Sequence, residues 1–177
     1  MMLLAGSLLH SIRLAGALSL AVVAMQAPAV TREYQAALLQ LVRSSDEEIA
    51  QRKASAQRFY GIVPGADEGR FLAQLRAVEP SNAETLAAAV ERHRSLTASY
   101  DRIERAGDLW RPMVAVKDVV GDEAGPRRQI AQTVLDSFAP QLDLSFAAAA
   151  YGLVGLFLGS LIGELLATLV PRHHLVR

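Results

Sequence analysis

The sequence contains no cysteine, which excludes disulfide scaffolds, thiolate metal sites and cysteine nucleophiles. It also lacks the P-loop, the G-x-G-x-x-G fingerprint, the G-x-S-x-G elbow and the H-E-x-x-H zinc motif. Histidine, aspartate, glutamate and serine are dispersed along the chain rather than gathered into a catalytic pattern. We therefore expect a protein that is not an enzyme and that needs no cofactor or metal.

An excess of positive charge is missing as well. Lysine occurs only at positions 53 and 117, and the 18 basic residues are balanced by 18 acidic ones. Within segment 31–144, 15 Lys and Arg stand against 17 Asp and Glu, so this segment is slightly acidic. Nothing in this balance favours a nucleic acid as a partner.

What the sequence has in surplus is hydrophobicity, and the surplus lies at the two ends. Hydrophobic residues make up 51% of the chain, and the mean hydropathy is +0.22. From Phe146 to Val170 only Glu164 is acidic or basic, and a run of about 20 apolar residues suffices to cross a bilayer. We predict a transmembrane helix over 145–171, followed by a short basic tail, 172–177, and hence a lipid bilayer as the first partner.

The N-terminal end carries a second apolar run, Leu14–Val30, which follows Arg13. A secretory signal peptide would explain this run, with Ala27-Pro28-Ala29 as the small-residue cleavage site. An uncleaved signal anchor over 1–30 explains it equally well, and the proline inside the triplet argues against processing. We expect the anchor, and with it two membrane spans.

The basic residues next to the two apolar runs predict the orientation of the chain. Arg13 precedes the first run and the basic tail follows the second, so the positive-inside rule places both termini in the cytoplasm. The chain is then a two-span protein of the bacterial inner membrane, with segment 31–144 in the periplasm. Arginine is far more frequent than lysine, which favours a GC-rich bacterial source.

Segment 31–144 has helical periodicity throughout and shows no alternating strand pattern. We predict helices over 31–60, 67–78, 81–106, 110–120 and 127–138, with Thr31 as the N-cap of the first and Ser81 with Glu84 as a capping box for the third. The two long helices carry matching apolar stripes. The expected fold class is therefore all-α, with terminal transmembrane helices that flank an extracytoplasmic antiparallel helical hairpin or small bundle.

The most specific pattern in the chain is a stripe of small residues at a spacing of four in the last helix. It consists of Gly155, Gly159, Gly163 and Ala167. Such a face lets another helix approach closely, whether from a second copy, another membrane protein or the first span. The alternative is that glycine is simply common in membrane helices.

Two charged residues belong to the predicted membrane regions, Glu164 and Arg13. An intramembrane carboxylate suggests a proton relay or a cation site, but such a path normally has several polar groups. We expect Glu164 to reach the interface or to pair with Arg13 between the spans. His93 is expected to be a packed core residue, and His173 and His174 to belong to the basic tail rather than to a metal site.

Several segments together resemble a known family. An N-terminal span, Glu33-Tyr34 at the start of a long helix, the stretch Asp136-Ser137-Phe138-Ala139-Pro140 and a glycine-rich final span resemble small bacterial membrane proteins described only as a domain of unknown function. The resemblance implies a two-span inner-membrane protein with a helical periplasmic segment, and it brings no catalytic residues.

Three functional hypotheses follow from these patterns. The first is a non-enzymatic envelope scaffold or interaction protein that assembles with itself or another membrane protein through the glycine-rich face. The second is a ligand-sensing periplasmic helical module that works through a partner. The third is an oligomer that conducts ions or protons past Glu164.

Overall fold

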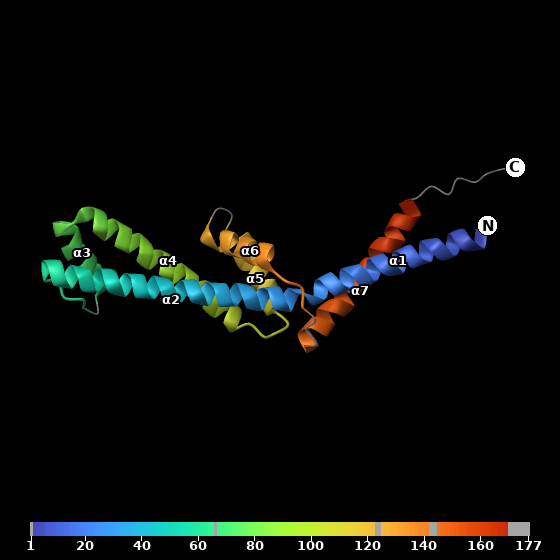
Figure 1. The fold of residues 1–177 in the computed structure, drawn as a ribbon, viewed down its shortest axis with the longest axis horizontal. Coiled ribbons are helices and arrows are strands. Elements are labelled where there is room, and N and C mark those ends of the chain that lie inside the picture. Colours follow the sequence, from blue (N-terminus) through green and yellow to red (C-terminus); the bar gives the residue numbers. More distant parts are fainter. Residues whose placement is uncertain (1, 66, 123–124, 142–144, 170–177) are drawn as a thin grey trace.

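A computed structural model of the chain describes residues 2–65, 67–122, 125–141 and 145–169, without the side chains of residues 2–9, 167 and 169. The described residues form helices and no strands, as the periodicity predicts. The predicted basic tail, 172–177, lies outside the described residues. Figure 1 shows an elongated molecule in which α1 (Met2–Met25) crosses α7 (Phe146–Leu169) at one end and the remaining helices form an arm that extends away from this pair.

The arm continues directly from the first helix. Gln26 is the one turn residue between α1 and α2 (Ala27–Tyr60), and the two helices follow one another along the long axis in Figure 1. The 34 residues of α2 extend the chain by about 50 Å at 1.5 Å per residue. We predicted a boundary between the anchor and the arm after residue 30. This boundary lies within α2, which is a continuous helix.

Thr31 does not cap a helix, so that prediction was wrong. It lies in the second turn of α2, and its hydroxyl donates to the carbonyl of Ala27 at 2.8 Å. The preceding apolar run is itself helical, and the amide of Val30 donates to the carbonyl of Gln26 at 3.0 Å. A helix that enters from α1 leaves no free amides at Thr31 for a side chain to cap.

At the far end of the arm, α2 ends and the next helix begins close to where the sequence predicts. Gly61 ends α2 with a φ of +67°, a left-handed conformation that favours glycine, and its amide donates to the carbonyl of Gln57 at 3.0 Å. Asp67 then caps α3 (Glu68–Val78) by accepting the amide of Arg70 at 3.1 Å. The predicted helix over 67–78 is therefore confirmed to within one residue.

The predicted capping box at Ser81 and Glu84 does not form. The return helix α4 (Pro80–Glu104) starts one residue earlier, with Pro80 in its first turn and Glu79 before it. The Glu79 carboxylate accepts instead from the side-chain amide of Asn82 at 3.1 Å and from the Tyr60 hydroxyl at 2.9 Å. Proline fits the first turn of a helix because its missing N–H has no partner there, and this preference sets the start.

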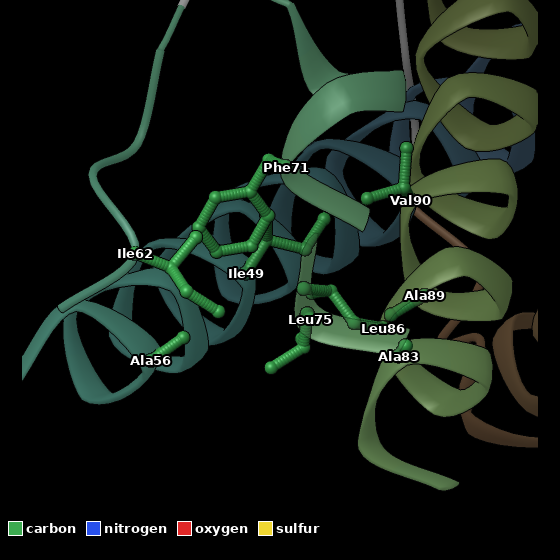
Figure 2. Close-up of a cluster of buried hydrophobic side chains, with 9 residues drawn as sticks. All are labelled: Ile49, Ala56, Ile62, Phe71, Leu75, Ala83, Leu86, Ala89 and Val90. Carbon is green, nitrogen blue, oxygen red and sulfur yellow. The ribbon is translucent and has the colours of Figure 1, made fainter. Parts of the chain in front are cut away.

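Helices α2 and α4 pack side by side as an antiparallel hairpin, and two clusters of buried side chains hold it. The distal core, drawn in Figure 2, joins the outer ends of α2 and α4 to α3. Leu75 and Leu86 are fully buried there, and burying each such side chain stabilises the fold by about 2 kcal/mol. The members of the distal core are Ile49, Ala56, Ile62, Phe71, Leu75, Ala83, Leu86, Ala89 and Val90.

The proximal core lies nearer to the crossing pair. Two short helices, α5 (Arg111–Val120) and α6 (Pro126–Ser137), pack here against α2 and α4. The predicted hairpin is therefore extended at its base into a four-helix cluster. The members of the proximal core are Tyr34, Leu38, Leu96, Ile103, Ala115, Ile130 and Val134.

Candidate functional site

The interface between α1 and α7 is built on glycines, and two of them have no room for a side chain. A β-carbon at Gly155 would lie 2.8 Å from the carbonyl oxygen of Leu20 and 2.9 Å from the Cα of Ala21. One at Gly159 would lie 2.7 Å from the Cα of Ala17. Because these contacts are with backbone atoms, the two helices approach closely only if both positions stay glycine.

The opposing surface on α1 is also made of small residues. Ala17, Ala21 and Ala24 contact Gly159 and Gly155, and Ala17 is 2% exposed. Gly152 extends the glycine side of the interface, where a β-carbon would meet the side chain of Met25 at 2.7 Å. The structure thus packs the glycine face against α1 of the same chain.

The remaining members of the predicted stripe are placed differently. A β-carbon at Gly163 would lie 3.6 Å from Cβ and Cγ of Arg13, an ordinary van der Waals distance. The side chain of Ala167 lies outside the described residues. Helices α1 and α7 are therefore closest at Gly155 and Gly159 and lie farther apart at Gly163.

Arg13 and Glu164 lie near one another along the pair, because Arg13 contacts Gly163, the residue before Glu164. Glu164 is exposed on the outer side of the α1–α7 pair, and no ion pair joins the two side chains among the described residues. The Nε atom of Arg13 is buried and has no hydrogen-bond partner in the described part of the chain. The two charges are thus neighbours in space but not bonded.

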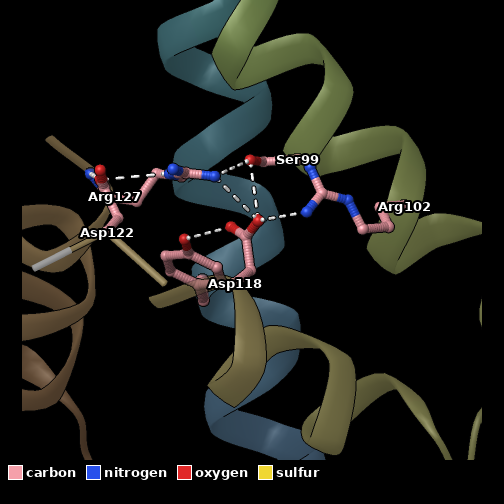
Figure 3. A network of polar contacts seen from close by, with 6 residues as sticks. Ser99, Arg102, Asp118, Asp122 and Arg127 are labelled. Atoms are coloured by element: carbon pink, nitrogen blue, oxygen red, sulfur yellow. Dashed lines mark hydrogen bonds and ion pairs between the residues drawn. The ribbon is translucent and has the colours of Figure 1, made fainter. Parts of the chain in front are cut away.

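The base of the arm contains a buried carboxylate, Asp118, which joins four helices (Figure 3). Its side chain is fully buried. It accepts the Tyr34 hydroxyl of α2 at 3.2 Å and the Ser99 hydroxyl of α4 at 3.0 Å. Arg127 of α6 donates to it at 3.1 Å, and the exposed Arg102 lies 3.3 Å away. The carboxylate of α5 therefore bonds to every other helix of the proximal cluster.

A second carboxylate holds Arg127 in place. The Asp122 carboxylate accepts the backbone amide of Arg127 at 2.9 Å and pairs with its Nε at 3.1 Å. A side chain at Gly125 would collide with this carboxylate and displace it from Arg127. The pairing with Asp122 holds the Arg127 guanidinium next to the Asp118 carboxylate.

The electrostatics of this cluster follow from its burial and its charges. Burial, together with the negative charge of Asp118, raises the pKa of the Tyr34 hydroxyl well above its usual range. The hydrogen bond from Arg127 lowers the pKa of Asp122, and the same bond raises the pKa of Arg127. Around neutral pH Tyr34 is therefore neutral, while Asp122 and Arg127 carry opposite charges.

Two hollows lie where the arm meets the α1–α7 pair. A polar cavity of about 250 Å³ is lined by Pro28 and Thr31 of α2, Arg111 of α5, and Phe146 and Ala147 of α7. An apolar groove of about 500 Å³, here called the base groove, has in its lining Val23, Val30, Val116, Val120, Leu135 and Phe138. Because residues of both α2 and α7 line the polar cavity, the first turn of α7 lies level with Pro28 and Thr31 of α2.

The histidines and acidic residues of the described part of the chain form no cluster that could hold a metal ion. The Nδ1 atom of His93 lies 3.0 Å from the Ser45 hydroxyl, within the α2–α4 hairpin. His173 and His174 lie outside the described residues.

Residues 8–174 match the family model DUF2937, described as a protein of unknown function. The chain belongs to this family. The match covers most of the sequence, so the DUF2937 family includes both apolar ends and the arm, and the predicted resemblance to a family of unknown function is confirmed. Neither a curated protein nor a solved structure matches the chain.

Sequence reasoning missed two features of this DUF2937 chain. The first is the alanine stripe on α1, although Ala17 and Ala21 show the same spacing of four as the glycines. The second is the Asp118 cluster. The visible signal was that Asp118 is the only acidic residue between Arg111 and Val120, where the other side chains are mainly apolar. A lone carboxylate in such a run is normally paired when it is buried.

Proposed function

We propose that this chain is a non-enzymatic, two-span membrane protein that holds a rigid helical arm outside the bilayer and acts through contacts with other proteins. In the described part of the chain, two helical runs are long and apolar enough to cross a membrane, one that begins at His10 and one over Phe146–Leu166. The observation that carries the proposal is the continuity of the first run, which extends for 51 residues from His10 to Tyr60 and is interrupted only by the turn residue Gln26.

That continuity supports a mechanical coupling between the membrane pair and the arm. Because α2 leaves α1 after a single turn residue, the direction of the arm depends on how α1 is held. The glycine interface holds α1 against α7, and the Asp118 cluster ties α5 and α6 to α2 and α4. An arm fixed at both points is suited to present a surface at a set distance from the membrane.

The same contacts support retention of the N-terminal span. Cleavage at Ala27-Pro28-Ala29 would remove Ala17, Ala21 and Ala24, the surface on which Gly155 and Gly159 pack. A signal peptide would leave that glycine face without its partner. We therefore favour the uncleaved anchor, with both termini in the cytoplasm and the arm in the periplasm of a bacterial inner membrane.

The glycine face is covered by α1 in a single chain, so assembly uses other surfaces of the protein or an exchange of α7 between copies. Substitution of Gly159 by leucine separates these routes. It is expected to loosen the α1–α7 pair in every case, and to change the oligomeric state only if α7 is exchanged.

Topology reporters and cross-linking test the proposal together. A reporter active only outside the cytoplasm is fused after position 144, and one active only inside it after position 177, while the untagged protein is cross-linked in membranes. The proposal expects activity from both fusions and a discrete cross-linked assembly. A cytoplasmic position 144 would contradict the topology, and a chain that stays monomeric and captures no protein would contradict the interaction role.

One alternative has its own supporting observation. A ligand-sensing module would use the continuous α1–α2 helix to transmit a change in the arm across the membrane, and the polar cavity beside Thr31 and Arg111 lies at that junction. A small molecule that binds the full chain and changes the cross-linking of α1 to α7 would favour this function over a static scaffold.

A further inference from the structure

We propose that the base groove binds a hydrocarbon chain of a membrane lipid, so that α5 and α6 sit in the surface layer of the bilayer beside the first span. This inference rests on the proposed function, because it requires that α1 and α7 cross a membrane. It adds a binding site and names its ligand class.

The groove lies at the level where α7 begins and extends alongside the end of α1. The polar cavity shows that α7 begins level with Pro28 and Thr31 of α2. The lining of the base groove includes Thr31 and continues past this level to Val23, in the last turn of α1. Part of the groove therefore lies alongside the apolar span rather than above it, where the acyl chains of the adjacent leaflet are the nearest occupants.

The described side chains that line the groove are mostly apolar. None of the described residues that line the groove is acidic or basic. Its polar side chains are already bonded within the protein: Thr31 donates to Ala27, Tyr34 donates to Asp118, and Gln26 accepts the amide of Gln141 at 3.3 Å. An occupant thus needs no hydrogen-bonding groups, which describes a hydrocarbon chain.

The apolar walls of the groove are exposed in the single chain. Val23, Val116, Val120 and Leu135 are each between 60% and 68% exposed in the chain alone, although they come from three different helices and line the same groove. Large apolar side chains gathered in this way are normally covered by another apolar group.

The size of the groove favours a narrow occupant. A helix with its side chains is about 10 Å across, so a groove of about 500 Å³ could take only the side chains of one face. We therefore assign the groove to lipid, and a helix of a second copy becomes an outcome of the test.

The test uses tryptophan fluorescence and lipids brominated on their acyl chains. The single native tryptophan is removed by Trp110→Phe, and one reporter is placed in the groove by Leu135→Trp. Asp136→Trp is the matched control, one residue along α6, exposed and outside the groove lining. Phe157→Trp, on the exposed side of α7, reports on the membrane span itself. Each full-length variant is reconstituted into phosphatidylcholine vesicles with and without brominated acyl chains.

The expected result is that Leu135→Trp loses most of its fluorescence in brominated vesicles, nearly as much as Phe157→Trp, while Asp136→Trp loses little. Quenching of Phe157→Trp without quenching of Leu135→Trp would overturn the lipid site and leave the membrane spans intact. If Leu135→Trp is shielded from both lipid and water in a cross-linked dimer, a second copy fills the groove and the proposal is equally wrong. Absence of quenching at Phe157→Trp would instead refute the proposed function.

Discussion

Removal of the Asp118 carboxylate is expected to loosen the base of the arm more than any other single charge change outside α1 and α7. The variant Asp118→Ala leaves the hydroxyls of Tyr34 and Ser99 without their acceptor in a buried site. It also leaves Arg127 with Asp122 as its one remaining carboxylate among the described residues. Each loss leaves a polar group without a hydrogen-bond partner after folding has already removed that group from water.

The magnitude follows from the burial of the partners. Breaking a fully buried ion pair costs about 3–5 kcal/mol. Here Arg102 is 55% exposed and Arg127 is 18% exposed, so water can solvate part of the abandoned charge. We therefore expect a loss of about 2–4 kcal/mol, which corresponds to a roughly 30- to 1,000-fold rise in local opening.

Amide hydrogen exchange on the full chain in detergent micelles measures this opening helix by helix. Protection is expected to fall in α5 and α6 and to remain unchanged in α7. Asp101→Asn is the matched control, because it removes the carboxylate of an ion pair with Arg105 whose side chains are 45% and 80% exposed, and should cost less than about 1 kcal/mol. If Asp118→Ala changes exchange no more than Asp101→Asn does, the cluster does not hold the base of the arm.

Three further predictions concern the glycine interface, acid and processing. Gly155→Ala forces a β-carbon against the α1 backbone and should weaken the α1–α7 pair by about 1–3 kcal/mol. Gly163→Ala makes only ordinary van der Waals contacts and should change the stability of the pair by less than about 0.5 kcal/mol. Thermal unfolding in micelles compares the two variants, and equal effects would contradict the packing. The hydrogen bond from Lys53 lowers the pKa of Glu68, so the stabilisation by this bond is complete above the unfolded-state pKa and is lost as the pH falls below about 4. Unfolding titrations should show that Glu68→Gln reduces this acid dependence, and an unchanged pH profile would refute it. The mass of the protein purified from membranes should include the residues before Ala27. A mature chain that starts at or after Ala27 would show that the N-terminal apolar run is a signal peptide.

The hairpin could be predicted because its information is local. The apolar stripes that contain Leu38 on one helix and Leu96 on the other recur every three to four residues, and Gly61 and Asp67 mark a stop and a start with residue types that those backbone positions favour. The predicted bounds therefore lie close to those of the structure. Predictions failed at Thr31 and Ser81, where a cap pattern was present but the adjoining chain was already helical.

The Asp118 cluster could not be predicted in this way, because its bonds join residues far apart in sequence. Tyr34 lies 84 positions from Asp118, and Ser99 lies 19 positions away. No local pattern encodes such pairs, since they form only after four helices have packed. The glycine face lies between these cases: its spacing identified a close helix contact, but the choice of α1 as the partner came from the fold.

The central claim is that α1 and α7 pack face to face within one chain, and disulfide formation tests it most directly because the sequence has no native cysteine. In Arg13→Cys with Gly163→Cys, the two β-carbons lie 3.6 Å apart, within the range of a disulfide. Leu14→Cys with Gly163→Cys is the control, since Leu14 is 52% exposed on α1. A protease site in the loop at Gly65 then separates linkage within a chain from linkage between chains. The account predicts that the Arg13 pair, and not the Leu14 pair, keeps the two cleaved halves of one chain together until reductant is added. Disulfide-linked dimers in place of joined halves, or equal linkage in both pairs, would contradict it.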